Sequence, residues 1–168
     1  DVCSSDLTKP SVDDFAIDNV NGDAVKVVVE NSEAAPRYAG LTIKGVTVKE
    51  SPDWMKQRLN AIGVRPINNI VDITNYILHE TGQPLHCFDV NEITGGTVIV
   101  KTLAEGTPFV TLDGVERKLS EKDLMICNQN EGMCIAGVFG GLKSGVTETT
   151  TDVFLESAYF NPTWIRKS

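Results

Sequence analysis

Residues 68–78 read Asn-Asn-Ile-Val-Asp-Ile-Thr-Asn-Tyr-Ile-Leu, the strongest helical pattern in the chain. The apolar residues occupy so much of the helical circumference that we expect this helix to be buried on more than one side. Asn68 or Asn69 predicts its start, and Gly82 and Pro84 predict its end. The segments on both sides of it have the patterns of strands, so the sequence predicts an α+β fold.

A shorter helix is expected just before this one. Ser51-Pro52-Asp53 supplies a cap, a first-turn proline and an early carboxylate, and apolar residues then recur at helical spacing until Gly63. Asp113-Gly114 predicts a tight hairpin turn, because both positions accept a positive φ. The expected strands span residues 25–30, 38–48, 98–100, 109–112, 115–119, 124–127, 133–138 and 153–160.

The composition is that of one globular domain. The 168 residues are 41% apolar and 23% charged, and a chain of this length buries about two thirds of its extended surface on folding. The formal charge of -8 excludes a protein that holds a nucleic-acid backbone by charge alone. No apolar run approaches the roughly 18 to 20 residues of a membrane span, so we expect a cytoplasmic protein without a membrane partner. Four cysteines without a Cys-x-x-Cys pair, and only two histidines, predict neither a zinc cluster nor a disulfide framework.

Both ends of the sequence suggest a piece of a longer chain. The first residue is Asp1 rather than methionine, and turn signals at residues 11–14 and 21–22 mark a polar opening. Asn161-Pro162 predicts the start of a helix, but the sequence stops at Ser168 after barely two turns. We therefore expect a fragment.

Two polar residues are candidates for chemistry. Glu156 lies inside the apolar run 153–160, so its carboxylate either points outward from an edge strand or lies in a pocket with a hydrogen-bond partner. His86 follows the helix stop within residues 82–89, which we expect to form a rigid loop, and it has either a structural or a functional role. A nucleophilic pair of His86 and Cys87 is excluded, because neighbours in an extended segment point to opposite faces.

Two further segments each allow a structural and a functional interpretation. Residues 139–145 contain three glycines and a lysine, but the spacing is not that of a phosphate loop, and a turn between strands is favoured over close approach of a ligand to the backbone. Thr74 and Asn75 lie in the apolar helix that follows Arg65. Their side chains either bond the preceding helical turn or neighbouring backbone, or line a polar pocket.

Residues 65–76 and 82–89 closely resemble the central B3/B4 region of the β subunit of bacterial phenylalanyl-tRNA synthetase. Later segments resemble further blocks of that region in the same order, at residues 112–119, 137–141 and 155–162. The resemblance runs from about Pro36 to the C-terminus. It implies a lead-in at residues 1–35 and an editing domain at 36–168, without the C-terminal segment that closes the pocket in the family.

The resemblance also implies an activity. In that family the region is an α+β domain with a mixed or antiparallel, sandwich-like β core and a few helices, and it hydrolyses tyrosine wrongly attached to tRNA(Phe). A pocket for a phenyl ring rejects an added hydroxyl only weakly, so a second site is needed. The implied catalytic residues are Glu156, which accepts from the tyrosine hydroxyl, and His86, near the ester and the terminal adenosine. The implied substrate-binding residues are Arg65, Thr74, Asn75, Phe139, Gly140 and Gly141.

The implied partners are the 3′ end of tRNA(Phe) carrying tyrosine and the α subunit of an α2β2 synthetase. The resemblance implies no metal or cofactor in this domain, because ATP and Mg²⁺ belong to the synthetic site of the whole enzyme. Two alternatives stay open. In the first, the chain is a non-catalytic structural or tRNA-docking module of the same synthetase. In the second, it is a free-standing relative of the editing domain.

Overall fold

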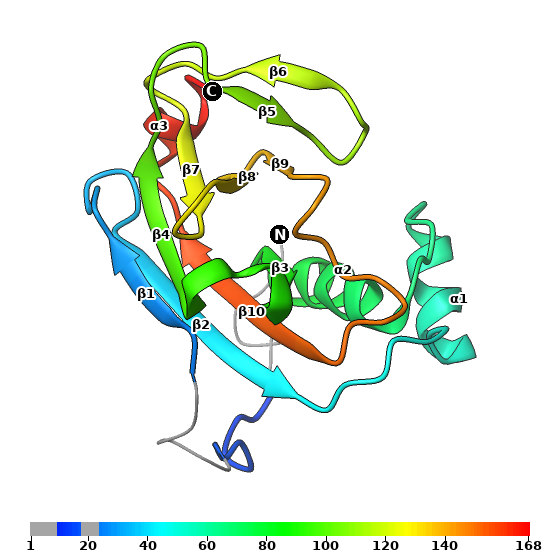
Figure 1. Cartoon of the computed structure of the whole chain (residues 1–168). Helices are drawn as coiled ribbons and strands as arrows, with labels where there is room; N and C mark the ends of the chain where they lie inside the picture. Colours follow the sequence, from blue (N-terminus) through cyan, green and yellow to red (C-terminus); the bar gives the residue numbers. More distant parts are fainter. Residues whose placement is uncertain (1–9, 18–23) are drawn as a thin grey trace, which may run out of the picture.

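Two β-sheets face each other across the main core of the computed structural model, which describes residues 10–17 and 24–168. The five-stranded sheet has the order β1 (Lys26–Val29), β4 (Thr97–Thr102), β7 (Leu124–Cys127), β8 (Gly132–Ile135) and β9 (Phe139–Gly140). The three-stranded sheet has the order β2 (Arg37–Lys44), β10 (Asp152–Tyr159) and β3 (Leu85–Asp89). Only β1 and β4 pair in parallel among these described strands (Figure 1). The predicted α+β class with a sandwich-like core is confirmed.

The core lies between the inner faces of the two sheets. Phe88 of β3 and Phe154 of β10 are fully enclosed and stand opposite each other in the strand register. They pack against Val98, Val100 and other apolar residues of the five-stranded sheet. Each large aromatic side chain removes on the order of 150–250 Å² from water, so this pair dominates the join between the sheets.

A hairpin covers the outer face of β7 and β8. It consists of β5 (Pro108–Val110) and β6 (Glu116–Lys118), and Phe109 packs against Met125 and Ile135. The predicted hairpin is confirmed, but its turn is longer than expected. The N–H of Thr111 donates to the carbonyl of Val115 at 3.1 Å, and Gly114 has a positive φ of 76° whereas Asp113 does not. This is a three-residue loop with glycine in the left-handed region.

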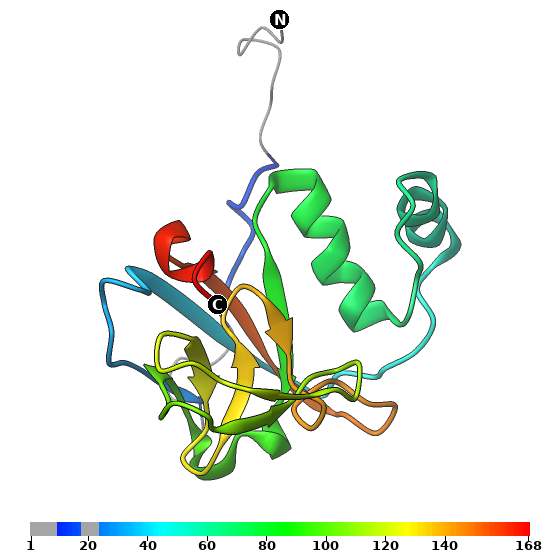
Figure 2. The ribbon, with the colours of Figure 1, turned by 90° about the horizontal axis from the view of Figure 1, so that it is seen from above.

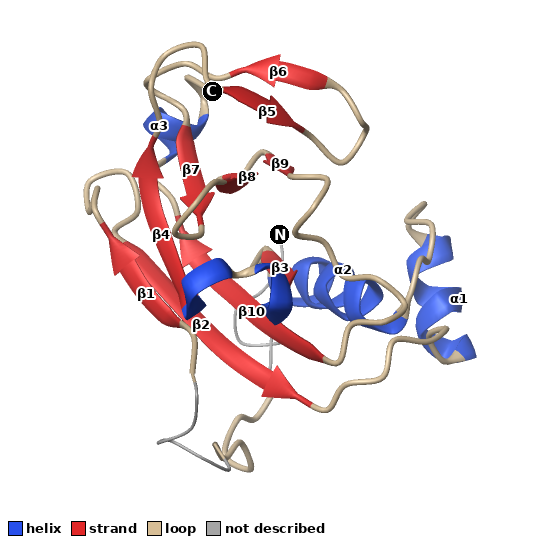
Figure 3. Cartoon of the chain, in the orientation of Figure 1, coloured by secondary structure: helices blue, strands red, loops and turns tan. Residues whose placement is uncertain are grey.

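The helices α1 (Asp53–Ala61) and α2 (Asn69–Thr81) lie together at one side of the sheets, where α2 packs against β3 (Figures 1 and 2). Asn68 caps α2, because its side chain accepts from the N–H groups of Ile70 and Val71. Gly82, with a φ of 78°, ends the helix as predicted. The remaining helical elements are the short α3 (Pro162–Ile165), η2 (Val90–Glu92) and η3 (Thr94–Gly96) (Figure 3).

Several local predictions are wrong. Within residues 82–89, which were expected to form a loop, Leu85–Asp89 make the strand β3. Ser51 does not cap α1; its hydroxyl donates instead to the carboxylate of Asp72 at 2.5 Å. Strand β2 ends at Lys44 rather than at residue 48, because Gly45 turns the chain with a φ of 71°.

Helix α2 is buried on two sides, as expected, but not by apolar residues alone. Ile70 and Thr74 lie on one side, and Asp72 is fully enclosed about 200° around the helix from Ile70. Ile73 is 43% exposed. The second buried side is therefore polar.

Two loop predictions have different outcomes. The predicted turn at residues 11–14 is present, with the N–H of Phe15 donating to the carbonyl of Val12 at 3.1 Å, whereas the one at residues 21–22 lies outside the described residues. The glycine-rich segment 139–145 is more than a turn, because its first two residues form the edge strand β9. In the described part of the chain, no helix is long and apolar enough to cross a membrane.

Candidate functional site

Glu156 lies at the middle of β10, the central strand of the three-stranded sheet. Its side chain shares a face with Phe154, and this face points into the core between the sheets. The residue is only 6% exposed. The outward-pointing interpretation is therefore wrong, and the carboxylate is held inside the molecule.

The carboxylate has one hydrogen-bond donor among the described residues. The hydroxyl of Tyr38, on β2, donates to Oε2 of Glu156. Burial raises the pKa of Glu156 to about 7, while the bond from Tyr38 lowers it. Burial and the nearby carboxylate raise the pKa of the Tyr38 hydroxyl above its usual range, so the phenol stays protonated and continues to donate.

His86 lies beside this pair. It stands directly opposite Glu156 in the register of β3 and β10, and its ring packs edge-on against Phe88 with 4.5 Å between centroids. Burial lowers the pKa of His86, so the imidazole is neutral near pH 7. A neutral imidazole has one donor and one acceptor nitrogen and can orient a water or a hydroxyl.

Gly140, on β9 of the five-stranded sheet, lies next to His86. A side chain at this position would meet Leu112 at 2.8 Å and Cε1 of His86 at 3.4 Å from its Cβ. The missing side chain therefore lets Leu112 approach the backbone of β9 next to the imidazole. We define the polar cluster as Tyr38, His86, Gly140 and Glu156, which come from β2, β3, β9 and β10.

Two thiols adjoin the polar cluster. Burial is the main cause that raises the pKa of Cys87, to about 12, and that of Cys134 above its usual range; the charge of Glu156 contributes to both. The thiol of Cys134 donates to the carbonyls of Ile135 and Phe139, with 3.3 and 3.4 Å from sulfur to oxygen. Both side chains therefore stay protonated and are poor nucleophiles.

The other predicted site residues do not all share this location. Thr74 donates its hydroxyl to the carbonyl of Val71 at 2.7 Å, the helical bond that the structural interpretation expects. Arg65 is exposed in the connection between α1 and α2, and Asn75 is half-buried on α2. Neither side chain forms a hydrogen bond or ion pair with another described residue.

Phe139 and Gly141 flank Gly140 but face different surroundings. The Phe139 ring is 38% exposed and lies under the guanidinium of Arg117, 5.9 Å from its centroid. Gly141 is enclosed, and a Cβ there would stand 2.5 Å from the carbonyl oxygen of Met133. Only Gly140 of these three therefore borders the polar cluster directly.

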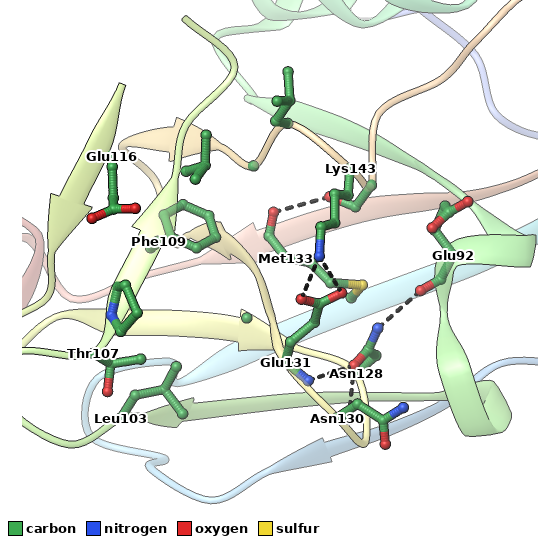
Figure 4. Close-up of a pocket in the computed structure, with 16 residues that line it drawn as sticks. Glu92, Leu103, Thr107, Phe109, Glu116, Asn128, Asn130, Glu131, Met133 and Lys143 are labelled. Atoms are coloured by element: carbon green, nitrogen blue, oxygen red, sulfur yellow. Dashed lines mark hydrogen bonds and ion pairs between the residues drawn. The ribbon is translucent and has the colours of Figure 1, made fainter. Parts of the chain in front are cut away.

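A separate hollow of about 440 Å³ lies between the β5–β6 hairpin, β8 and the loop after β9 (Figure 4). It includes Gly141, but not His86, Gly140 or Glu156. Some of its polar groups bond one another: Lys143 pairs with Glu131 at 3.1 Å, and the amide of Asn128 donates to the carbonyl of Glu92 at 2.9 Å. The side chains of Glu92, Glu116 and Asn130 also line the hollow and form no hydrogen bond with another described residue.

Sequence reasoning found His86, Gly140 and Glu156, but it missed Tyr38. The alternation of β2 and β10 fixes which side chains share a face, whereas the pairing of these strands joins residues 118 positions apart. No local signal reports such a pairing.

Two facing sheets, a helical pair, a buried carboxylate and a half-buried phenol and imidazole define an α+β domain with a polar cluster between its sheets. The family model of the B3/4 domain matches residues 34–168, so the chain belongs to the B3/4 domain family.

Similar proteins agree with this assignment. The chain is 73% identical over 162 residues to the phenylalanine–tRNA ligase β subunit of Bacteroides fragilis, covering 96% of this chain and 20% of that protein. It is 44% identical over 167 residues to the corresponding subunit of Salinibacter ruber, covering 99% of this chain and 20% of that one. The chain thus spans about a fifth of the length of these curated relatives.

A solved structure shares the fold. It is an N-terminal fragment of the phenylalanyl-tRNA synthetase β-subunit from Pyrococcus horikoshii, with a TM-score of 0.60 and 14% identity. The similarity covers 85% of this chain and 45% of that fragment.

Proposed function

We propose that this chain is the editing domain of a phenylalanine–tRNA ligase β subunit and that it hydrolyses tyrosine wrongly attached to tRNA(Phe). The names of the relatives support the synthetase, and membership of the B3/4 domain family supports the module. In this proposal residues 36–168 form the editing domain, and residues 1–35 lead into it from the preceding part of the subunit.

The observation that carries the proposal is the hydrogen bond from a phenol hydroxyl to Glu156. It demonstrates that this buried carboxylate accepts from the chemical group that distinguishes tyrosine from phenylalanine. Because Tyr38 already bonds Oε2, a phenylalanyl ester would leave only Oε1 without a donor, at a cost of about 1–3 kcal/mol. Selection of this kind reverses the preference of a synthetic pocket for the less polar ring.

The hydrolytic step uses the neighbouring residues. The neutral imidazole of His86 orients the attacking water or the ribose hydroxyls, and Gly140 forms the pocket wall beside the aminoacyl group, where a larger side chain would press on Leu112 and His86. An aminoacyl ester is already activated, so positioning of water and stabilisation of the developing oxyanion suffice without a covalent nucleophile. The remaining proposed substrate-binding residues are Arg65, Thr74, Asn75, Phe139 and Gly141.

The proposed partners are the 3′ end of tRNA(Phe) and the α subunit of an α2β2 enzyme. The net charge of -8 fits a module that receives an RNA end while other parts of the enzyme hold the RNA backbone.

A non-catalytic structural or tRNA-docking role is the second candidate. The small exposed fraction of Glu156 and its bond to Tyr38 favour it, because they also describe a satisfied buried carboxylate.

Misacylation by the intact synthetase separates the two candidates. We expect Glu156→Ala and Gly140→Trp in the complete β subunit, assembled with its α subunit, to let Tyr-tRNA(Phe) accumulate while charging with phenylalanine continues. Gly145→Ala is the control, because the nearest atom to a Cβ there is 3.7 Å away. If neither site variant accumulates Tyr-tRNA(Phe), the module is non-catalytic.

A further inference from the structure

Tyr38 reaches Glu156 diagonally across two paired strands. In the register of β2 and β10, Tyr38 stands opposite Ala158 and Gly40 stands opposite Glu156. Because residues two apart on a strand share a face, Tyr38 and Glu156 project on the same side of the sheet. The Tyr38 ring is held by an edge-on contact with Phe160, with 6.5 Å between centroids.

The second carboxylate oxygen of Glu156 remains available. Tyr38 occupies Oε2, and Oε1 accepts no hydrogen bond from another described residue. Within the described ranges, no completely enclosed side-chain nitrogen or oxygen lacks a partner. Oε1 therefore retains some accessible surface, and this surface lies on the face that Glu156 shares with His86.

We propose that Tyr38 is a positioning residue of this site, whose hydroxyl holds Oε2 of Glu156 and thereby presents Oε1 to the hydroxyl of the tyrosine to be removed. This inference rests on the proposed editing function. Oε1 is the acceptor for the substrate, and Tyr38 fixes the rotation of the carboxylate without touching the substrate. A carboxylate held at one oxygen loses less rotational freedom when the other oxygen binds a hydroxyl.

Tyr38 also favours the ionised form of the carboxylate. The titratable groups around Glu156 are Tyr38 on β2, His86 and Cys87 on β3, and Cys134 on β8. Neither thiol carries a charge near neutral pH, the imidazole is neutral there, and Glu156 forms no ion pair with any described residue. Burial alone would favour the protonated acid, so the Tyr38 hydroxyl is the recorded contact that favours the charged acceptor.

The test uses Tyr38→Phe in the complete β subunit assembled with its α subunit. Preformed Tyr-tRNA(Phe) and Phe-tRNA(Phe) are the substrates, and the readouts are the ratio of their kcat/KM values and the pH profile for Tyr-tRNA(Phe). We expect the ratio to fall about tenfold or more, since a hydrogen bond to a charged group is lost. The acidic limb should move to higher pH, because the ionised carboxylate loses its donor. Tyr159→Phe, at an exposed position on β10, is the matched control and should change neither readout.

A second variant decides the question even if Tyr38→Phe does not fold. Incorporation of 3-fluorotyrosine at position 38 keeps the ring and makes its hydroxyl a stronger donor, so the acidic limb should move to lower pH. Editing by the wild type and loss in Glu156→Ala, together with an unchanged profile in each position-38 variant that folds, would overturn the role of Tyr38 alone. Absence of editing in the wild type, or full editing in Glu156→Ala, would instead overturn the proposed function and this inference with it.

Discussion

The buried carboxylate of Glu156 is unfavourable for stability, but the proposed function requires it. Its carboxylate is almost completely enclosed and has one hydrogen-bond donor among the described residues, so burial raises its pKa from 4.5 to about 7. A structural role alone would be served as well by a neutral acceptor. A buried carboxyl whose pKa is shifted into the neutral range is the pattern expected of a functional site.

Glu156→Gln should therefore stabilise the fold at neutral and alkaline pH. The folded-state pKa lies above the unfolded one, so the contribution of Glu156 to stability is full below about 4.5 and is lost as pH rises through about 7. Glutamine keeps an acceptor for Tyr38 without the charge. We expect a gain on the order of 1–3 kcal/mol at pH 8 that vanishes near pH 4.

Urea unfolding of wild type and variant at several pH values checks this expectation. When the free energy of unfolding of the wild type is subtracted from that of the variant, the contributions of all other titrating groups cancel. Glu116→Gln, on the exposed strand β6, is the control and should show no such pH dependence. A difference for Glu156→Gln that is flat with pH, or that shows destabilisation at pH 8, would contradict the buried ionised carboxylate.

The elements differ in how far they could be predicted from sequence. Caps and turns are local, and so Asn68, Gly82 and the Asp113-Gly114 hairpin were recognisable. The strand β3 was missed because Gly82 and Pro84 signal a break, whereas its extended conformation is stabilised by pairing with β10, far along the chain. Ser51 was misassigned for a similar reason, because its hydroxyl bonds Asp72 on the next helix.

Asp72 joins α1, α2 and the connection between them, so its loss should destabilise the helical pair. The enclosed carboxylate accepts from the hydroxyl of Ser51 at 2.5 Å and from the N–H of Ile67 at 2.8 Å. Asp72→Ala leaves both donors without an acceptor, and we expect a loss of about 2–4 kcal/mol in the free energy of unfolding. Asp53→Ala, which removes an exposed first-turn carboxylate and its surface pair with Lys56, should cost much less. Equal effects of the two substitutions in chemical denaturation would show that Asp72 does not stabilise this connection.

The packing of β2 on β10 gives a second prediction at this scale. A Cβ on Gly40 would lie 2.1 Å from Cζ of Phe154, and that ring is fixed in the core. Gly40→Ala should therefore lower the free energy of unfolding by about 1–3 kcal/mol through overpacking. Gly145→Ala has 3.7 Å to its nearest atom and should be nearly neutral. Thermal unfolding distinguishes these results, and a neutral Gly40→Ala would mean that β2 and β10 pack more loosely than described.

At the scale of the whole molecule, the polar cluster exists because two sheets close over it. Both sheets pair strands that are far apart in the sequence, since β1 pairs with β4, and β10 lies between β2 and β3. Periodicity indicated which residues face inward, and His86 and Glu156 were recognisable as unusual polar residues. Their meeting with Tyr38 and Gly140 depends on this long-range topology, which the resemblance to a known family could imply but spacing alone could not.

The most direct test of the editing proposal is deacylation of preformed Tyr-tRNA(Phe) by the intact β subunit in its assembly with the α subunit, compared with His86→Ala and Glu156→Ala. The proposal predicts rapid release of tyrosine by the wild type, slow release of phenylalanine from Phe-tRNA(Phe), and release near the spontaneous rate in both variants. Equal rates in all three proteins, or no hydrolysis by the wild type, would contradict it and leave the cluster with a structural role.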